Sequence, residues 1–381
     1  MSYAPGLQRK RVITAYVKPT NACNIGCTHC YLSEAVRADH ARMSLTVLET
    51  AARMLQEMAA RGHADVSVLW HGGEPMTLRP SWYEHAGRVL DEILPTRQES
   101  MQTSLIPYDS QWAELVHRRF QGGLGSSMDF RTRHIKGSSE AYQELWLRKV
   151  EHARADGIHV VPGIVVSRHE IGRAHTMVAW MEAHGFDTFN VERFNAFGSH
   201  HAECPTNAEH AAFLRDLFDA VMSRWRAGVY IEVRVLHAAL GGVMRGVPGD
   251  RWGTTCQSDF VVIEPDGSIN SCPDRASHEA PHANVSNGYP GLMESADRRR
   301  WIRVQAVGHR NDHCAHCEYQ RWCRSGCPIT PNDPIGQGDC SGYRSFLNHV
   351  RAFCEAPDCA QLAASYLSPS IALPPREHLH V

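Results

Sequence analysis

The chain has 381 residues, 43% of them hydrophobic, and a formal net charge of −2 at pH 7. This length predicts two or three folded units, and the hydrophobic content is that of a globular protein. The near-neutral charge provides no basic field for nucleic acid or an anionic membrane, and no apolar run reaches the ~18–20 residues that span a bilayer. The polar residues 1–11 contain no apolar signal core. We therefore expect a cytoplasmic protein without nucleic-acid or membrane partners.

The first predicted strand, residues 12–18, is rich in β-branched side chains and leads into a cysteine loop. The loop holds Cys23, Cys27 and Cys30 at C-x3-C-x2-C spacing. Thiolates are soft ligands, and at this spacing they suit an iron–sulfur cluster or zinc. Four ligands close a structural zinc site, whereas three thiolates leave one iron of a four-iron cluster open. A zinc site with a distant fourth ligand stays open as the alternative.

The next two elements are a helix and a strand. The helix is predicted over residues 44–61, where apolar residues recur at helical spacing and where Ser44 or Thr46 would cap the first turn. The strand, residues 65–70, leads directly into Gly72-Gly73-Glu74-Pro75. Glycines at such a point let the backbone approach a ligand closely.

The alternation of strands and helices then continues to residue 226. Helices are predicted at 81–94, 109–120, 139–156, 172–184 and 207–226, and strands at 100–106, 123–129, 158–166 and 186–194. Six strand–helix units predict an α/β fold, a partial (β/α)6 barrel with a parallel sheet and outer helices. Ligands bind at the carboxyl ends of such strands, and the cysteine loop and the glycine pair both follow a strand on that face.

The second half of the chain is less regular. Residues 228–255 mix Gly, Pro and Arg with short apolar runs and are expected to bridge the barrel, 11–227, to a Cys-rich domain, 256–345. Residues 260–269 predict a hairpin with a Pro-Asp-Gly turn, which would bring Cys256 and Cys272 near each other. Residues 346–381 predict a short helix and a disordered tail, and residues 1–10 a flexible N-terminus.

Thirteen cysteines without a secretion signal indicate metal ligands more than disulfides. Ten of them stand at ligand-type spacings, and Cys204, Cys354 and Cys359 do not. Cys314, Cys317, Cys323 and Cys327 could close a zinc site unaided, so zinc ribbons stay open as an alternative for the second half.

The cysteine loop and the following Gly-Gly-Glu-Pro motif resemble the radical SAM superfamily. The resemblance implies a four-iron cluster on Cys23, Cys27 and Cys30, whose open iron binds S-adenosylmethionine (SAM). Reduction of SAM then yields methionine and a 5′-deoxyadenosyl radical. His29 replaces the family's usual aromatic residue before the third cysteine, and Tyr31 is a second neighbour of the cofactor.

Further SAM contacts follow from the same resemblance. In the family the backbone of the motif at Gly72, Gly73, Glu74 and Pro75 contacts the SAM amino group. The candidates for holding the ribose and the carboxylate of SAM are Ser127, Arg131 and Arg133. For each arginine, a solvated surface charge is an equally good interpretation. Glu192 is a candidate to face the adenosyl group or the substrate.

The later cysteines resemble the SPASM extension of radical SAM enzymes. The matching positions are Cys256, Gly267, Cys272, Cys314, Cys317, Cys323, Cys327 and Cys340. The resemblance implies two auxiliary four-iron clusters, three clusters in all. The outer one would be held by Cys314, Cys317, Cys323 and Cys340, and the inner one by Cys256, Cys272 and Cys327. The inner cluster lacks one family ligand, which leaves an open iron, a non-cysteine ligand or Cys204.

The candidate general base is Asp274. In the related sulfatase-maturing enzymes an aspartate directly follows the second hairpin cysteine, whereas here Pro273 intervenes. Asp274 could equally cap the following turn.

We expect a radical SAM/SPASM enzyme that abstracts hydrogen from a substrate C–H bond and oxidises or crosslinks a peptide or protein side chain. The alternative is small-molecule natural-product biosynthesis on a nucleoside, sugar or amino acid, including sulfur insertion from the inner cluster. A non-catalytic zinc or iron–sulfur protein is the third reading. The resemblance also implies an external electron donor such as flavodoxin or ferredoxin, and a peptide substrate would need a separate leader-binding protein or direct recognition by the barrel.

Overall fold

The computed structural model describes residues 11–194, 201–246, 259–276, 280–308, 314, 316–323, 340 and 343–369. The expected flexible N-terminus, 1–10, and two predicted ligands, Cys256 and Cys327, lie outside these residues. Among the described residues, no helix combines the length and apolar character needed to cross a bilayer.

A ten-stranded sheet forms the centre of the molecule, in the order β12-β11-β10-β1-β3-β4-β5-β7-β8-β9. Neighbouring strands from β10 to β9 run parallel, and only β11 and β12 are antiparallel to their neighbours. The strands are β1 (Arg11–Thr20), β3 (Ala64–Gly72), β4 (Gln98–Thr103), β5 (Gly123–Ser127), β7 (His159–Val166), β8 (Thr188–Arg193), β9 (Glu232–Val233), β10 (Phe260–Ile263), β11 (Ser268–Asn270) and β12 (Ala283–Asn284).

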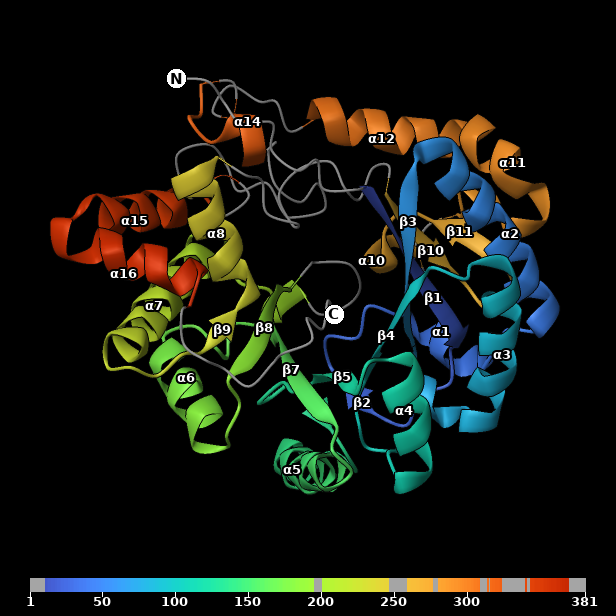
Figure 1. Ribbon diagram of the computed structural model, residues 1–381, viewed down its shortest axis with the longest axis horizontal. Helices are drawn as coiled ribbons and strands as arrows, with labels where there is room; N and C mark the ends of the chain where they lie inside the picture. The colour runs from blue at the N-terminus through green and yellow to red at the C-terminus, as the bar shows by residue number, and fades with distance from the viewer. Residues whose placement is uncertain are drawn as a thin grey trace.

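Helices cover the outside of the curved sheet (Figure 1). They are α2 (Leu45–Gly62), α3 (Pro80–Ile93), α4 (Ala113–Arg119), α5 (Ser139–Ala155), α6 (Ala174–Ala183) and α7 (Asn207–Arg226). Each coincides with a predicted helix, and Ser44 caps α2 as expected, since its hydroxyl accepts from the Val47 N–H at 3.2 Å. The core lies between sheet and helices, where Val68 and Trp70 of β3 and Leu48 and Leu55 of α2 are buried.

The described part of the expected bridge, residues 228–246, instead extends the sheet. β9 pairs with β8, and α8 (Arg234–Arg245) follows it. The prediction was wrong because a two-residue strand leaves almost no periodic signal, although Ile231 and Val233 are fully buried. The C-terminal part is also more ordered than expected, because α15 (Arg344–Glu355) is followed by a second helix, α16 (Pro357–Leu367).

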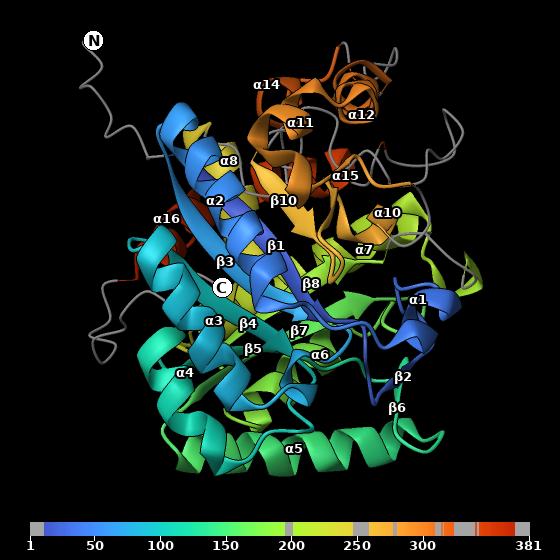
Figure 2. The ribbon, with the colours of Figure 1, turned by 90° about the vertical axis from the view of Figure 1, so that its right-hand side faces the viewer.

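The predicted hairpin is confirmed, since β10 and β11 pair antiparallel with Val262 opposite Asn270. It does not stand apart from the barrel, because β10 also pairs parallel with β1, Val17 opposite Ile263 (Figure 2). Cys272 lies two residues beyond Asn270, away from the turn. The remaining elements are β2 (Gly26–Cys27), β6 (Arg133–His134), α1 (Glu34–Asp39), α10 (Pro273–Ala276), α11 (Gly288–Glu294), α12 (Ala296–Gly308), α14 (Gln320–Cys323) and 3-10 turns η1 (Pro75–Thr77), η2 (Ser110–Trp112), η3 (His201–Glu203) and η4 (Val285–Asn287).

Candidate active site

The loops after β1 and β3 are joined through backbone hydrogen bonds. The Gly73 N–H donates to the Thr20 carbonyl at 3.0 Å, and the Glu74 N–H donates to the Ala22 carbonyl at 2.8 Å. A Cβ on Gly73 would lie 2.4 Å from the Ala22 oxygen, and Gly72 has a φ of +122°. The glycines therefore let the cysteine loop approach the end of β3 closely.

The Glu74 carboxylate is buried and has three donors. It accepts from the Met76 N–H at 2.9 Å, the Thr103 hydroxyl at 2.6 Å and the Ser104 N–H at 2.7 Å. These bonds join the loop after β3 to the loop after β4. The side chain thus binds protein groups, and a contact of this motif with SAM would use its backbone, as the family resemblance implies.

The cysteine loop is held against the segment that follows β5. β2 pairs with β6, Cys27 opposite Arg133, and the Thr28 N–H donates to the Thr132 carbonyl at 2.8 Å. Cys23, Cys27 and Cys30 are unbridged and half-buried. The thiols act electrostatically on one another, although the described residues contain no group of three His, Cys, Asp or Glu side chains placed to hold a single metal ion.

Burial raises the pKa of Cys23 to about 11 and that of Cys27 to about 12. One cation opposes this effect, because Arg133 Nη1 donates to Cys27 Sγ at 3.3 Å and lowers the pKa of that thiol. Three unbridged thiols on one loop beside a guanidinium are a donor set that fits a thiolate-held cluster.

Asp129 organises the other side of the loop, and the sequence analysis did not single it out. Its carboxylate is fully buried, accepts from the Val165 N–H at 2.6 Å, pairs with the Arg133 guanidinium and lies 3.5 Å from His29 Nε2. The His29 ring also contacts Phe194 edge to face, with centroids 6.0 Å apart. A detectable signal was the position of Asp129 at the end of a strand, four residues before Arg133.

The other predicted SAM contacts divide between the interior and the surface. Ser127 accepts from Gln102 Nε2 at 3.0 Å, and Glu192 lies half-buried on β8. Arg131 is exposed and pairs with Glu140 at 3.2 Å, so the structure supports the surface reading and not a SAM contact for this arginine. Its side chain is solvated because it lies in the turn beyond β5, outside the sheet interior.

Aromatic side chains connect Tyr31 to the interior face of β1 and β3. The Tyr31 hydroxyl donates to the Gly72 carbonyl at 2.9 Å and receives a hydrogen bond from the Tyr16 hydroxyl at 3.4 Å. Tyr16 stacks on His71 with ring centroids 4.6 Å apart. Burial, with a smaller effect of the Lys18 ammonium, lowers the pKa of His71 to about 3.

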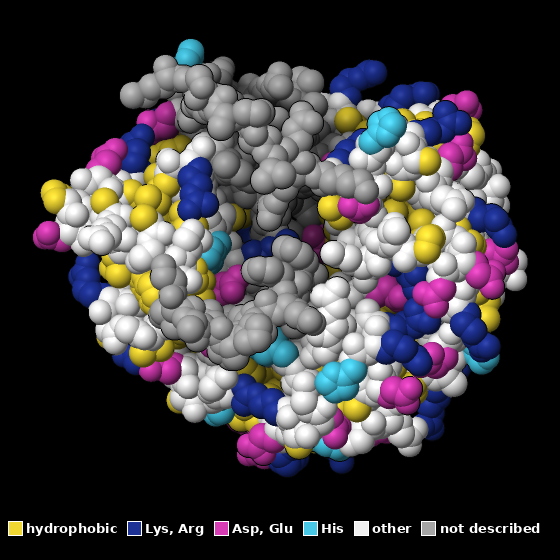
Figure 3. Space-filling model, in the orientation of Figure 1, with side chains coloured by type: hydrophobic (Ala, Val, Ile, Leu, Met, Phe, Trp, Pro, Cys, Tyr) yellow, Lys and Arg dark blue, Asp and Glu magenta, His cyan; other side chains and the backbone are white. Residues whose placement is uncertain are grey.

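Asp274 lies on the same side of the sheet as these rings. It is the second residue of α10, after Pro273. Its carboxylate helps to raise the pKa of both Tyr16 and Tyr31, although burial is the larger cause for each. In Figure 3 acidic and basic side chains are visible in a hollow at the centre of this face.

The described auxiliary cysteines are distributed over the second half of the chain. Cys272 lies between β11 and α10, Cys314 and Cys323 are buried, and Cys317 and Cys340 are half-buried. The Cys317 N–H donates to the Cys314 carbonyl at 3.1 Å, so these two belong to one turn.

Cys204 lies beside the loop that carries the first three cysteines. Its thiol donates to the Phe194 carbonyl at 3.4 Å. The adjacent Glu203 accepts from the Thr28 hydroxyl at 2.9 Å.

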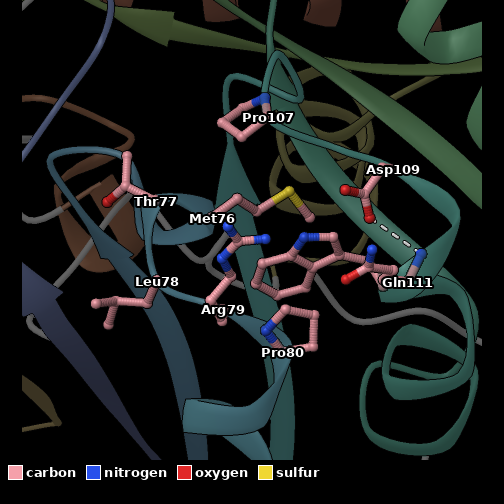
Figure 4. Close-up of a pocket in the computed structure, with 9 residues that line it drawn as sticks. Met76, Thr77, Leu78, Arg79, Pro80, Pro107, Asp109 and Gln111 are labelled. Carbon is pink, nitrogen blue, oxygen red and sulfur yellow. Dashed lines mark hydrogen bonds between the residues drawn. The ribbon is translucent and has the colours of Figure 1, made fainter.

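A separate cavity of about 270 Å³ lies between η1 and η2 (Figure 4). It is lined by Met76, Thr77, Leu78, Arg79, Pro80, Pro107, Asp109, Gln111 and Trp112. The Asp109 carboxylate accepts from the Gln111 N–H at 3.0 Å, which caps η2. None of the predicted site residues lines this cavity, so it is distinct from the site around the cysteine loop.

Residues 17–175 match the Radical SAM superfamily. This part of the chain is a radical SAM domain. The matched region begins on β1 and contains the cysteine loop, the Gly-Gly-Glu-Pro motif, Asp129 and Arg133. The family supports SAM and one iron–sulfur cluster as cofactors of the radical SAM domain.

Among curated proteins, the chain is 21% identical over 355 residues to the serine-type anaerobic sulfatase-maturating enzyme of Klebsiella aerogenes, covering 87% of this chain and 83% of the relative. A solved structure of native anSMEcpe with bound AdoMet and a peptide superposes with a TM-score of 0.76 at 18% identity, covering 93% of this chain and 99% of that one. SuiB of Streptococcus suis bound to its precursor peptide SuiA gives a TM-score of 0.59 at 14% identity, covering 84% and 72%. These likenesses establish the shared fold.

Proposed function

We propose that this radical SAM enzyme oxidises or crosslinks a side chain of a peptide or protein. The observation that carries the proposal is the continuity of the sheet: β10 pairs with β1, so the hairpin with Cys272 and Asp274 adjoins the strand that leads into the cysteine loop. Two similar structures contain bound peptides. A peptide side chain is the substrate class that this arrangement and these relatives favour.

The cofactor roles are assigned to the residues of the loop. Cys23, Cys27 and Cys30 hold the cluster, and the backbone at Gly72–Pro75, the rings of His29 and Tyr31, Ser127 and Glu192 contact SAM or border its site. Arg133 offsets thiolate charge at Cys27, with Asp129 fixing the guanidinium. When bound, the cluster and SAM supply the 5′-deoxyadenosyl radical that abstracts hydrogen from the substrate.

The second half would hold two auxiliary four-iron clusters. Cys314, Cys317, Cys323 and Cys340 are the proposed ligands of one, and Cys256, Cys272 and Cys327 those of the other. Since Cys204 is bonded beside the first cysteine loop, an open iron or a non-cysteine ligand is the favoured state of the inner cluster. An external donor such as flavodoxin or ferredoxin would supply electrons.

Asp274 is the proposed base. Oxidation of a substrate C–H bond removes a hydrogen atom, an electron and a proton, and the last of these needs an acceptor near the substrate. The electrostatic effect of Asp274 on the Tyr16 and Tyr31 hydroxyls favours a position at the interior face of β1.

The testing experiment is 5′-deoxyadenosine formation by anaerobically reconstituted protein with SAM and a strong reductant. We expect the nucleoside from the wild type and none from a C23A/C27A/C30A variant. Cys359→Ala is the matched control, because this cysteine lies on α16 with its sulfur bonded to Arg226. Retained cleavage in the triple variant would overturn the assignment of the loop.

Substrate class is tested by adding Ser- or Cys-containing sulfatase peptides in one arm and nucleosides in another. For the Ser-containing peptide, loss of two hydrogens detected by mass spectrometry is the expected result. For the Cys-containing peptide the same oxidation gives a thioaldehyde, which water converts to the aldehyde with release of H2S. Stimulated cleavage and a modified product in the nucleoside arm alone would contradict peptide modification and indicate small-molecule chemistry.

A further inference from the structure

A buried ion pair joins the first strand of the barrel to the hairpin. Lys18 of β1 is fully buried, and its Nζ lies 2.6 Å from Glu264 Oε1. The Glu264 side chain is 13% exposed. The two residues are 246 positions apart in the chain, so the pair exists only because β10 pairs with β1.

The pair lies where the backbone ladder between the two strands ends. Val17 opposite Ile263 is the last matched position between the two strands. Lys18 is the next residue of β1, and Glu264 directly follows β10. Glu264 then begins the turn of the hairpin, since its carbonyl accepts from the Gly267 N–H at 2.9 Å. The ion pair therefore fastens the tip of the hairpin to the carboxyl end of β1.

Lys18 contacts the cysteine loop at the same time. Its ammonium lies 5.0 Å from the centre of the Tyr31 ring. Tyr31 directly follows Cys30 and donates to the Gly72 carbonyl. One side chain thus contacts the hairpin and the loop that begins the radical SAM site.

Stability alone gives a weak reason for such a pair. Taking an ammonium and a carboxylate out of water costs several kcal/mol each, and an apolar pair of similar size is often equally stable or more so. A short ion pair nevertheless fixes two chain segments at one point with little freedom. Its position beside Tyr31 indicates that this fixed geometry serves the site.

We propose that Lys18 and Glu264 are positioning residues that set the orientation of the hairpin, and with it Cys272 and Asp274, relative to the cysteine loop. The inference rests on the proposed function of the hairpin as part of the active site. In this proposal neither Lys18 nor Glu264 contacts SAM or the substrate.

The chain supplies a matched control at the other end of the same ladder. Arg11 and Asp259 also pair between β1 and the start of β10, but their side chains are 42% and 19% exposed. Exposed ion pairs contribute little to the free energy of unfolding, because solvent screens their charges. Asp259→Asn therefore removes an ion pair between the same strands without touching the hairpin tip.

The first experiment compares hydrogen–deuterium exchange of residues 260–276 in reconstituted wild type, Lys18→Met, Glu264→Gln and Asp259→Asn. We expect roughly tenfold or faster exchange in the first two variants and no change in the third. Lys18→Arg should keep the wild-type exchange, because the guanidinium also pairs with Glu264. Unchanged exchange in Lys18→Met and Glu264→Gln would overturn the proposal.

A spectroscopic measurement separates positioning from general stability. In Glu264→Gln the electron paramagnetic resonance signal of the auxiliary clusters should change, while the SAM-dependent change in the signal of the first cluster persists. A K18M/E264M variant should recover the thermal stability that the single variants lose, but not the wild-type signal of the auxiliary clusters. Recovery of both the stability and the signal would show that the ion pair has a structural role only. Absence of any auxiliary signal in the wild type would refute the proposed function instead, and the exchange comparison would still decide the role of the pair.

Discussion

A single buried carboxylate, that of Glu74, holds the loops after β3 and β4 together. Its three donors come from η1, from Thr103 at the end of β4 and from Ser104 in the loop that follows. A glutamine side chain in its place keeps one acceptor oxygen but replaces the other with an NH2 group. That NH2 group would face a buried hydrogen-bond donor, which would then have no acceptor. Glu74→Gln should lower the free energy of unfolding by about 3 kcal/mol, measured by urea denaturation.

The control for this change is Glu49→Gln on α2, where an exposed carboxylate pairs with Arg53 at 2.8 Å. That variant should lose less than about 0.5 kcal/mol. Equal effects of the two substitutions would show that the Glu74 carboxylate does not link the two loops.

His71 makes stability depend on pH. Its folded-state pKa is about 3, against 6.5 for an unperturbed imidazole, so below pH 6.5 the unfolded chain binds a proton that the folded chain does not. The favourable contribution is complete above pH 6.5 and is lost progressively as the pH falls toward 3. From pH 7.5 to 5.5 the loss is on the order of 1 kcal/mol.

The measurement is urea denaturation of the wild type and His71→Gln at these two pH values. The variant should lose less stability between them by that amount, because glutamine does not titrate. Replacing the exposed His85 by Gln controls for the loss of an imidazole. A wild-type pH dependence in His71→Gln would contradict the prediction.

At the scale of elements, the contact between the cysteine loop and the end of β3 depends on Gly73. A Cβ there would lie 2.4 Å from the Ala22 oxygen and 2.5 Å from the Asn21 oxygen. Both are backbone atoms, so they could move away only if the chain itself shifted. Gly73→Ala should cost about 2 kcal/mol or more and weaken SAM binding, as measured by denaturation and by SAM titration of the reconstituted protein.

Gly241 provides the opposite case. It lies within α8, and a Cβ built on it meets no atom of the described residues within 4 Å. Gly241→Ala should therefore stabilise the protein by about 0.5–1 kcal/mol, since alanine favours the helix. A shared loss of stability in both variants would show that the close approach at Gly73 is not the cause.

The periodic elements of the barrel were predictable because their signal is local. The helix after the cysteine loop, its Ser44 cap and the alternation through α7 all follow from residue spacing. β9 was not predictable, because two residues carry no period and their burial depends on helices that come more than a hundred residues later. The cysteines and the glycine pair could be found by spacing. For Asp129 the sequence offered only the local spacing to Arg133, since Val165 and His29 are brought to it by folding.

At the scale of the whole molecule, the hairpin and the barrel share one sheet. The sequence predicted the hairpin but placed it in a separate domain, because pairing of β10 with β1 is a long-range contact with no local signature. The same reason hides the contact of Lys18 with Glu264. The amino-acid sequence therefore does not reveal which strands are neighbours in the sheet. The candidate site depends on that arrangement of strands.

The opposite edge of the sheet depends on the C-terminal helix α16. The buried Tyr366 hydroxyl donates to the Ile231 carbonyl at 2.8 Å and accepts from the Val233 N–H at 3.1 Å, which ties α16 to β9 (Figure 1). Tyr366→Phe leaves both backbone groups buried without this partner, so it should lower the free energy of unfolding by about 2 kcal/mol.

The matched control is Tyr289→Phe. This change also removes a tyrosine hydroxyl, but it keeps the ring that contacts Arg61. Because β9 borders β8 and not the cysteine loop, 5′-deoxyadenosine formation should persist in Tyr366→Phe under conditions where it is folded. Equal stability of the two variants would mean that α16 does not hold this edge, and loss of cleavage in the folded variant would mean that the far edge of the sheet also shapes the SAM site.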